Sequence, residues 1–240
     1  MKNALLPTKH EHAPMTDTKM RLLDSAETLF AERGIAETSL RDITAHAEAN
    51  LAAVNYHFGG KDGLLEALFA RRFGPVNEER LLLLDGFEAA ATGTPLPLEQ
   101  ILYANFAPPF RRIDALGDAG QAFMRVVARI NADPSSSIHQ TFLRHFDEIR
   151  RRFHAALRSS LPELSTTEIE RRFHYGIAAM MHTFCWGQHL DCFRIDPTEP
   201  RERVLSSLIE YAAAGLRAAR GTVDVEALSE LESQVTEVTP

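Results

Sequence analysis

The chain has 240 residues, of which 45% are hydrophobic and 25% charged, and this composition is typical of a globular protein rather than a disordered or fibrous one. A formal net charge of −7 argues against a protein that coats nucleic acid by bulk electrostatics. The longest apolar runs fall short of the ~20 residues of a membrane span, and residues 1–15 lack the apolar region of a secretory signal. With only two cysteines, Cys185 and Cys192, we expect a cytoplasmic protein without membrane contact.

Apolar residues recur at spacings of three and four residues, with no convincing stretch of period two, so the sequence predicts an all-α fold. Gly74-Pro75 is expected to break or kink the fourth helix, and Pro108-Pro109 to separate two later ones. The expected helices are 16–33, 38–47, 50–57, 61–73 with a continuation to 91, 98–106, 114–131, 135–160, 166–190 and 198–220. The composition shifts beyond residue 92, which indicates two units. The expected organisation is a flexible leader at 1–15, an N-terminal three-helix unit at 16–73, a helical bundle at 74–220 and an acidic tail at 221–240.

Residues 38–58 have the pattern of two short helices joined by a tight turn, which is typical of a helix-turn-helix. Small side chains on its second helix would let the backbone approach a DNA groove, an apolar group can meet a thymine methyl, and Asn55 can donate and accept at base edges. Hydroxyl, imidazole and cationic groups nearby suit phosphate oxygens. The expected DNA-contacting residues are Thr38, Ser39, Arg41, Asn50, Leu51, Ala52, Ala53, Asn55, Tyr56, His57 and Lys61.

Lys61 begins the fourth helix, where a cation opposes the positive end of the helix dipole. A phosphate held by the Gly59-Gly60 backbone, the free N–H groups of that helix and the Lys61 ammonium would remove the conflict. The alternative is a solvated surface charge. An exposed polar helix end is likewise the alternative for Asn55, Tyr56 and His57.

Three stretches in this region resemble the DNA-binding domain of TetR-family transcriptional regulators: LFAERG at 29–34, TSLRDI at 38–43 and VNYHFGGKDGLL at 54–65. The resemblance spans about residues 18–70, with the motifs in the family's order and spacing. It implies a homodimer that binds a double-stranded DNA operator and releases it in response to a small effector. The stretches 50–58, 123–125 and 211–217 are similar, more narrowly, to the fatty-acid-responsive repressors of pseudomonads, which implies a hydrophobic effector such as a fatty acid or acyl-CoA.

One position departs from the family pattern, because Glu48 stands in the turn where the family usually has glycine. Glycine tolerates positive φ there at no steric cost, whereas a glutamate would be strained by about 1 kcal/mol or more. Residues 1–73 also carry nine Lys or Arg against ten Asp or Glu, so the broad basic surface of many DNA-binding domains is missing. Affinity is therefore expected to depend on dimeric positioning.

The resemblance implies that residues 74–220 form a ligand-binding and dimerisation bundle, whose last two helices pair with their copies in the dimer. Small residues in those helices fit close approach, with burial in the chain's own core as the alternative: Ala178, Ala179, Ala212, Ala213, Ala214 and Gly215. Apolar pocket walls would favour a long hydrophobic effector, whose polar head Arg125 or His182 can meet. A surface Arg and a core His are the alternatives for those two, and core filling for the rest. The pocket candidates are Phe106, Phe110, Phe123, Arg125, Val127, Phe142, Phe146, Met180, Met181, His182, Phe184 and Trp186.

Two other classes of function compete with this interpretation. A soft metal ion can in principle bind His182, Cys185, His189 and Cys192, which would make the protein a metal-sensing regulator. A helical lipid- or acyl-binding protein whose helix-turn-helix no longer binds DNA is the second alternative. The sequence contains no nucleophile elbow, phosphate-binding glycine loop or HExxH motif, so we expect no enzyme and no cofactor.

Overall fold

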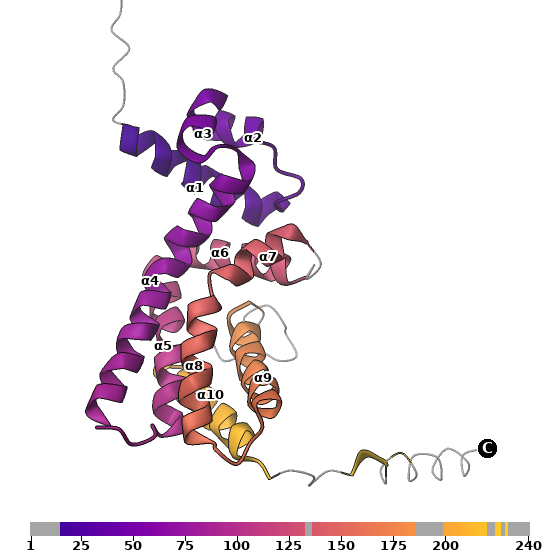
Figure 1. Cartoon of the computed structure of the whole chain (residues 1–240). Coiled ribbons are helices and arrows are strands. Elements are labelled where there is room, and N and C mark those ends of the chain that lie inside the picture. The colour runs from indigo at the N-terminus through magenta and orange to yellow at the C-terminus, as the bar shows by residue number, and fades with distance from the viewer. Residues whose placement is uncertain (1–14, 133–135, 186–198, 220–223, 227–228, 230–240) are drawn as a thin grey trace, which may run out of the picture.

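The computed structural model describes residues 15–132, 136–185, 199–219, 224–226 and 229, and all regular structure within them is helical (Figure 1). No helix in these ranges is long and apolar enough to cross a membrane. The helices are α1 (Met15–Arg33), α2 (Leu40–His46), α3 (Leu51–Phe58), α4 (Lys61–Ala90), α5 (Leu98–Leu116), α6 (Asp118–Asn131), α7 (Ser137–Arg144), α8 (Asp147–Ser160), α9 (Thr166–Cys185) and α10 (Arg201–Arg217). The all-α expectation is confirmed.

Helices α1, α2 and α3 pack around a small core at the N-terminal end of the molecule (Figure 1). α1 directs Leu22 and Phe30 inward, α2 contributes Ile43, and α3 contributes Val54, all completely buried. The first turns of α4 close this core with Leu64. The two short helices are thus held by burial rather than by their own length, since isolated helices of seven or eight residues are unstable in water.

α4 is a single helix of 30 residues that runs from this N-terminal unit along the bundle (Figure 1). The sequence predicted a break or a kink at Gly74-Pro75; the break is therefore wrong, and the kink stays a prediction. Pro75 removes one helical hydrogen bond, but Phe69 and Val76 on either side of it are buried. Tertiary packing of that apolar face outweighs the loss of one bond.

α5 also continues where the sequence predicted an interruption, because Pro108 and Pro109 both lie inside it. Pro109 has no N–H, so the carbonyl of Asn105, four residues earlier, loses its helical donor. The Nε of Arg80 on α4 donates to that carbonyl at 2.9 Å. A buried side chain from the neighbouring helix thus replaces the missing backbone donor.

The single helix expected at 135–160 is divided in two, because the chain leaves helical geometry at Phe146 (φ −110°, ψ 2°) between α7 and α8. Asn77 Nδ2 donates to the carbonyl of His145 at 2.7 Å, and the His145 ring contacts Phe69 and Phe73. Contacts with α4 therefore fix the break. The sequence carried one signal for it, since Asp147 and Glu148 supply the acids that favour a helix's first turn.

α10 packs against both α9 and α5 in the bundle (Figure 1). Ala212 and Ala213 are buried within the chain, whereas Ala178, Ala214 and Gly215 are exposed. The buried alanines therefore fit the interpretation as part of the chain's own core. The exposed small residues remain available for close helix approach in a dimer. The expected ends of these two segments at 190 and 198 lie outside the described residues.

Gly63 sets the start of α4 against the end of α3. A Cβ at this position would lie 1.8 Å from the carbonyl oxygen of Phe58, so Gly63→Ala should lower the free energy of unfolding by about 3 kcal/mol, the upper part of the range for overpacking. Gly86→Ala is the matched control in the same helix, because its Cβ would meet nothing within 4 Å. It should raise stability by about 1 kcal/mol. Urea denaturation followed by circular dichroism measures both, and equal effects would contradict this packing.

Candidate DNA-binding interface

α2 begins with a capping box, which fixes the first helix of the pair. The Ser39 hydroxyl accepts from the Asp42 N–H at 3.2 Å, and the Asp42 carboxylate accepts from the Ser39 N–H at 2.9 Å. The Ser39 hydroxyl also donates to the Asp42 carboxylate, and this bond, followed by the one from the Ser39 N–H, lowers the pKa of Asp42 below its usual value. Ser39 is thereby oriented at the exposed N-terminus of α2, where N–H groups attract anions.

The turn between α2 and α3 contains the strain that the sequence predicted, since Glu48 has a φ of +49°. The Ala49 N–H nevertheless reaches the Thr44 carbonyl at 2.9 Å and closes the end of α2. The side chain of Glu48 is exposed. The chain accepts a left-handed glutamate here because the neighbouring caps and buried side chains determine the turn.

α3 presents one face to the core and the opposite face to solvent. Asn50 caps the helix, its Oδ1 accepting from the Ala53 N–H at 2.8 Å, and Gly59 ends it in the left-handed conformation. Val54 is completely buried, whereas Tyr56 is 70% exposed. The solvent face is formed by Leu51, Ala52, Asn55 and Tyr56, with Ala53 and His57 half-buried at its sides. Arg41 on α2 is exposed as well.

Thr38 and Lys61 hold the structure together instead of pointing outward. Thr38 is completely buried, and its hydroxyl donates to the Gly34 carbonyl at 2.7 Å, so the expected contact between this hydroxyl and a phosphate is corrected. The Lys61 ammonium donates to the carbonyls of Ile35 and Thr38 at 2.6 and 2.7 Å. Lys61 therefore ties the loop between α1 and α2 to the start of α4, which resolves the conflict with the helix dipole without a bound phosphate.

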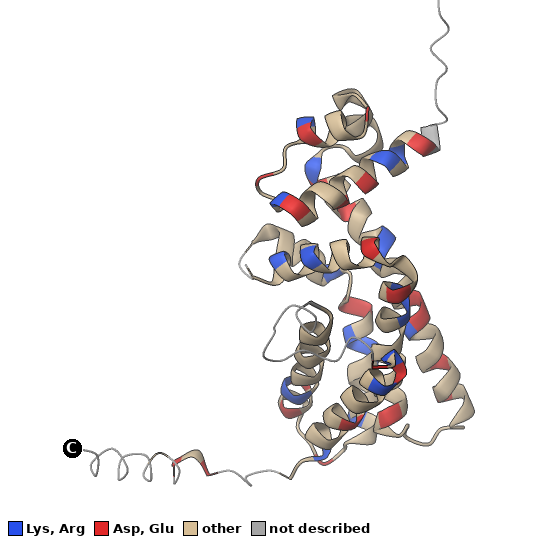
Figure 2. Ribbon diagram, turned by 180° about the vertical axis from the view of Figure 1, so that it is seen from behind, with Lys and Arg blue, Asp and Glu red and all other residues tan. Residues whose placement is uncertain are grey.

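Charge is mixed over the described surface, and Figure 2 shows acidic and basic residues interspersed without a continuous basic stripe along α1, α2 and α3. Long-range attraction to DNA is correspondingly weak. Binding by this face must rest on shape and on a small number of local contacts.

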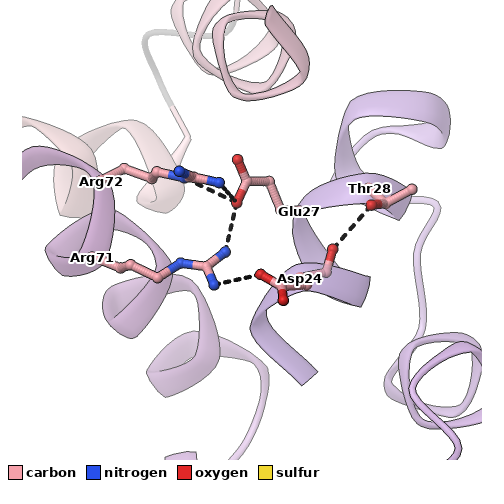
Figure 3. A network of polar contacts seen from close by, with 5 residues as sticks. All are labelled: Asp24, Glu27, Thr28, Arg71 and Arg72. Carbon is pink, nitrogen blue, oxygen red and sulfur yellow. Dashed lines mark hydrogen bonds and ion pairs between the residues drawn. The ribbon is translucent and has the colours of Figure 1, made fainter. Parts of the chain in front are cut away.

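An ionic network with a buried carboxylate at its centre joins α1 to α4 (Figure 3). Glu27 is 4% exposed, and its Oε2 accepts from the Arg71 and Arg72 guanidinium groups, each at 2.6 Å. Arg71 also bonds Asp24 at 2.6 Å. The guanidinium of Arg72 lies 5.9 Å from the ring centroid of Phe123 on α6. The network, which we call the Glu27 latch (Asp24, Glu27, Arg71 and Arg72), therefore connects α1, α4 and α6.

α6 has a second connection to the N-terminal unit, because Arg129 Nη2 donates to the carbonyl of Glu32 near the end of α1 at 3.3 Å. α1 and α6 pack directly on each other. A displacement of α6 would therefore disturb its packing and its hydrogen bond with α1.

The sequence-predicted pocket residues are distributed differently from the expectation. Arg125 and His182 are exposed on α6 and α9. Neither side chain lies in the interior of the bundle, where it was expected to meet the polar head of an effector, so the expectation for these two is corrected. Phe146 and Met181 are half-buried, and Trp186 lies outside the described residues. The other candidates are buried members of the hydrophobic core: Phe106, Phe110, Phe123, Val127, Phe142, Met180 and Phe184.

A surface cavity with a volume of about 340 Å³ lies between α7 and α8. Phe146 is the one predicted pocket residue in its wall. The full lining is Gln140, Leu143, Arg144, Phe146, Asp147 and Arg150.

Most residues of the metal-binding alternative lie outside the described part of the chain. His182 is exposed at the end of α9, while His189, Cys192 and the side chain of Cys185 lie outside the described residues. Within the described part of the chain, no three His, Cys, Asp or Glu side chains form a group suited to a metal ion.

A capped pair of short helices carried by a helical bundle defines a helix-turn-helix transcriptional regulator. The model of bacterial regulatory proteins of the tetR family matches residues 22–68. The model of the tetracyclin repressor-like C-terminal domain matches residues 103–215. The chain belongs to the TetR family of transcriptional regulators.

Individual relatives agree with this assignment mainly through the N-terminal unit. A probable HTH-type transcriptional regulator of Bacillus subtilis, YttP, is 43% identical over 51 residues, 21% of this chain and 25% of the relative. An HTH-type transcriptional repressor of Mycobacterium tuberculosis, Rv3405c, is 51% identical over 47 residues, 20% of this chain and 25% of the relative. The matches thus span about a quarter of each relative's length.

The fold as a whole is similar to that of solved structures. The fatty acid degradation regulator FadR from Bacillus halodurans aligns with a TM-score of 0.60 over 87% of this chain and 100% of its own, at 13% identity. At this identity the likeness concerns the fold alone.

Glu48 allows strain and charge to be separated by two substitutions. Glu48→Gly relieves the left-handed backbone and should raise the free energy of unfolding by about 1 kcal/mol. Glu48→Gln keeps the strained backbone and removes the charge, so it should leave stability unchanged. Thermal unfolding of both variants decides the matter, and a Glu48→Gly protein that melts no higher than the parent would contradict the assignment of strain.

The Glu27 latch should contribute strongly to stability. Glu27→Gln leaves the largely buried Arg72 guanidinium without its carboxylate and Arg71 with Asp24 alone, so it should lower the free energy of unfolding by about 3 kcal/mol. Glu148→Gln removes a similar partner from the exposed Arg151 and should change nothing measurable. Equal losses of unfolding free energy for both variants in urea titrations would show that the latch stabilises the fold no more than an exposed ion pair does.

Proposed function

We propose that the protein is a homodimeric repressor whose α3 enters the major groove of a near-palindromic operator and which a hydrophobic effector releases. The single observation that carries the proposal is the outward face of α3, with Leu51, Ala52, Asn55 and Tyr56 presented by caps at both ends of the helix. Two copies of α3 would occupy successive grooves about 34 Å apart. The proposal keeps residues 16–73 as the DNA-binding unit and 74–220 as the ligand-binding and dimerisation unit, in a cytoplasmic protein.

The exposed residues of the helix pair divide into two roles. Asn55 reads a base edge, and Leu51 and Ala52 contact thymine methyls or the groove floor. Ser39, Arg41 and Tyr56 bind phosphate oxygens and set the orientation of the helix. Asn50, Ala53 and His57 support the edges of this surface, and Lys61 acts by holding the loop before α2.

Dimerisation through α9 and α10 is supported by an exposed stripe on each helix. Tyr175 and Ala178 lie on the solvent face of α9, and Tyr211 and Ala214 on that of α10. Tyr175 and Tyr211 are 59% and 67% exposed, and tyrosine is a residue type that is enriched at interfaces. Alanines beside them permit close helix approach.

The effector class rests on the apolar character of the bundle and on the narrower sequence resemblance of the stretches 50–58, 123–125 and 211–217 to fatty-acid-responsive repressors. A fatty acid or acyl-CoA is the proposed class. Binding of the effector would change the position of the helix pair through α6 and the Glu27 latch. Phe123 on α6 contacts both Phe73 on α4 and the guanidinium of Arg72. Release requires that the effector bind the two states of this junction with unequal affinity.

Fluorescence anisotropy with the DNA that flanks the protein's own gene tests the proposal. We expect tight binding that weakens steeply with salt and that palmitate or palmitoyl-CoA weakens further. Binding that ignores lipid would refute the effector class and keep the DNA function. A protein that binds palmitate but no DNA would support the competing lipid-binding function.

Asn55 and Arg41 should fail in different ways if the two roles are assigned correctly. Asn55→Ala should cost about 1–3 kcal/mol at the operator and little on unrelated DNA, so that base preference relaxes. Arg41→Ala should weaken binding to both and reduce the salt slope by about one. Salt titrations on operator and scrambled DNA provide the measurement, and losses from Asn55→Ala that are independent of sequence would exclude it from base reading.

A further inference from the structure

One charged side chain in the bundle is buried without a counter-charge. Arg80 on α4 is only 5% exposed, and its guanidinium bonds two neutral acceptors, the Asn105 carbonyl at 2.9 Å through Nε and the Asn77 Oδ1 at 2.9 Å through Nη1. Within the described residues, no carboxylate pairs with the guanidinium. A buried cation is costly unless an anion compensates it.

The bond to Asn105 does not explain the charge. Nε fills the place of the N–H that Pro109 lacks, and a neutral donor would serve that carbonyl equally well. Burial lowers the pKa of Arg80 to about 10, so the side chain remains a cation at neutral pH and keeps its need for an anion.

Phe146 connects Arg80 with the surface cavity between α7 and α8. It lines the cavity, and its ring centroid lies 5.9 Å from the Arg80 guanidinium carbon. Phe146 stands at the non-helical junction of α7 and α8 and is half-buried. Arg144 and Arg150 against the single acid Asp147 make the cavity wall net positive.

We propose that Arg80 receives the carboxylate of a medium-sized amphipathic acid, which enters this cavity and takes the place of the Phe146 ring. The inference deepens the proposed function and rests on it, and it selects a free acid over a thioester, because the thioester has no carboxylate at the end of its chain. The apolar body of the ligand replaces Phe146 against Phe73 and Phe142, whose ring centroids lie 4.9 and 5.2 Å from it.

The size of the ligand follows from the cavity. At roughly 30 Å³ for a water-sized group, a volume of about 340 Å³ holds on the order of ten non-hydrogen atoms. Octanoate is an acid of that size. Octanamide keeps its chain and polar end but has no charge, so a comparison of the two isolates the contribution of the carboxylate.

Isothermal titration calorimetry on the full chain provides the test, with octanoate, octanamide, octanoyl-CoA and palmitate as probes. The wild-type protein should bind octanoate at least tenfold more tightly than octanamide, because an ionic bond to a buried guanidinium is worth more than a neutral one. Arg80→Gln should reduce that ratio to below twofold.

Asn77→Asp is the second variant, and it retains Arg80 with its bond to Asn105. The substitution puts a carboxylate where the Asn77 amide oxygen meets Nη1, so the protein supplies its own counter-charge and the preference for octanoate should again be lost. Arg151→Gln is the control, because this exposed Arg on α8 pairs only with Glu148 and should leave the ratio unchanged. Thermal unfolding shows whether each variant is folded.

The outcomes separate this inference from the proposed function. A wild-type ratio near one, or a tenfold ratio that survives in both Arg80→Gln and Asn77→Asp, would overturn the role of Arg80 and leave a hydrophobic effector in place. Binding of octanoyl-CoA without octanoate would do the same, whereas binding of palmitate without octanoate would overturn the size of the ligand. If no probe bound while the operator was still bound, both this inference and the effector class would be refuted, and the DNA-binding function would stand.

Discussion

The structure depends on the continuity of α4 and on the buried carboxylate that fastens it to α1. Glu27 accepts bonds from two adjacent arginines of α4, and one of these, Arg72, also lies over Phe123 of α6. The N-terminal unit is therefore attached to the bundle by a directional ionic contact rather than by a flexible linker. Since a buried ion pair loses much of its energy when its geometry is disturbed, small movements of α4 or α6 can change how the helix pair is held.

Aromatic side chains surround the same part of α4 and carry such movements toward it. Phe73 contacts Phe123, Phe142 and Phe146, and so joins α4 to α6, α7 and α8. Arg80, two helical turns further along, is held beside the same cluster by Phe146. A ligand that replaced one ring would alter the packing of its neighbours, because close-packed interiors shift between discrete arrangements.

The fold and the helix pair were largely predictable from sequence because they depend on local signals. Ser39 with Asp42, Asn50, and Gly59 are caps whose chemistry acts within one helical turn. The left-handed Glu48 was predictable because the family usually has glycine at this position. Errors arose where distant contacts override local preference. Pro75 and Pro109 remain inside helices because of buried neighbours and Arg80, and Lys61 turns toward backbone carbonyls of a loop more than 20 residues away. Arg80 and Glu27 themselves carried no signal, since burial of a single charged residue cannot be read from its neighbours in sequence.

The central claim is that effector binding changes the separation of the two recognition helices through α4. Pulsed electron paramagnetic resonance on the dimer measures this directly, with spin labels at Tyr56→Cys after Cys185→Ser and Cys192→Ser. Without ligand, the label separation should be consistent with recognition helices about 34 Å apart, and saturating octanoate or palmitate, whichever releases the operator, should shift it by several ångström. A ligand that releases DNA while the distance distribution stays unchanged would contradict the account.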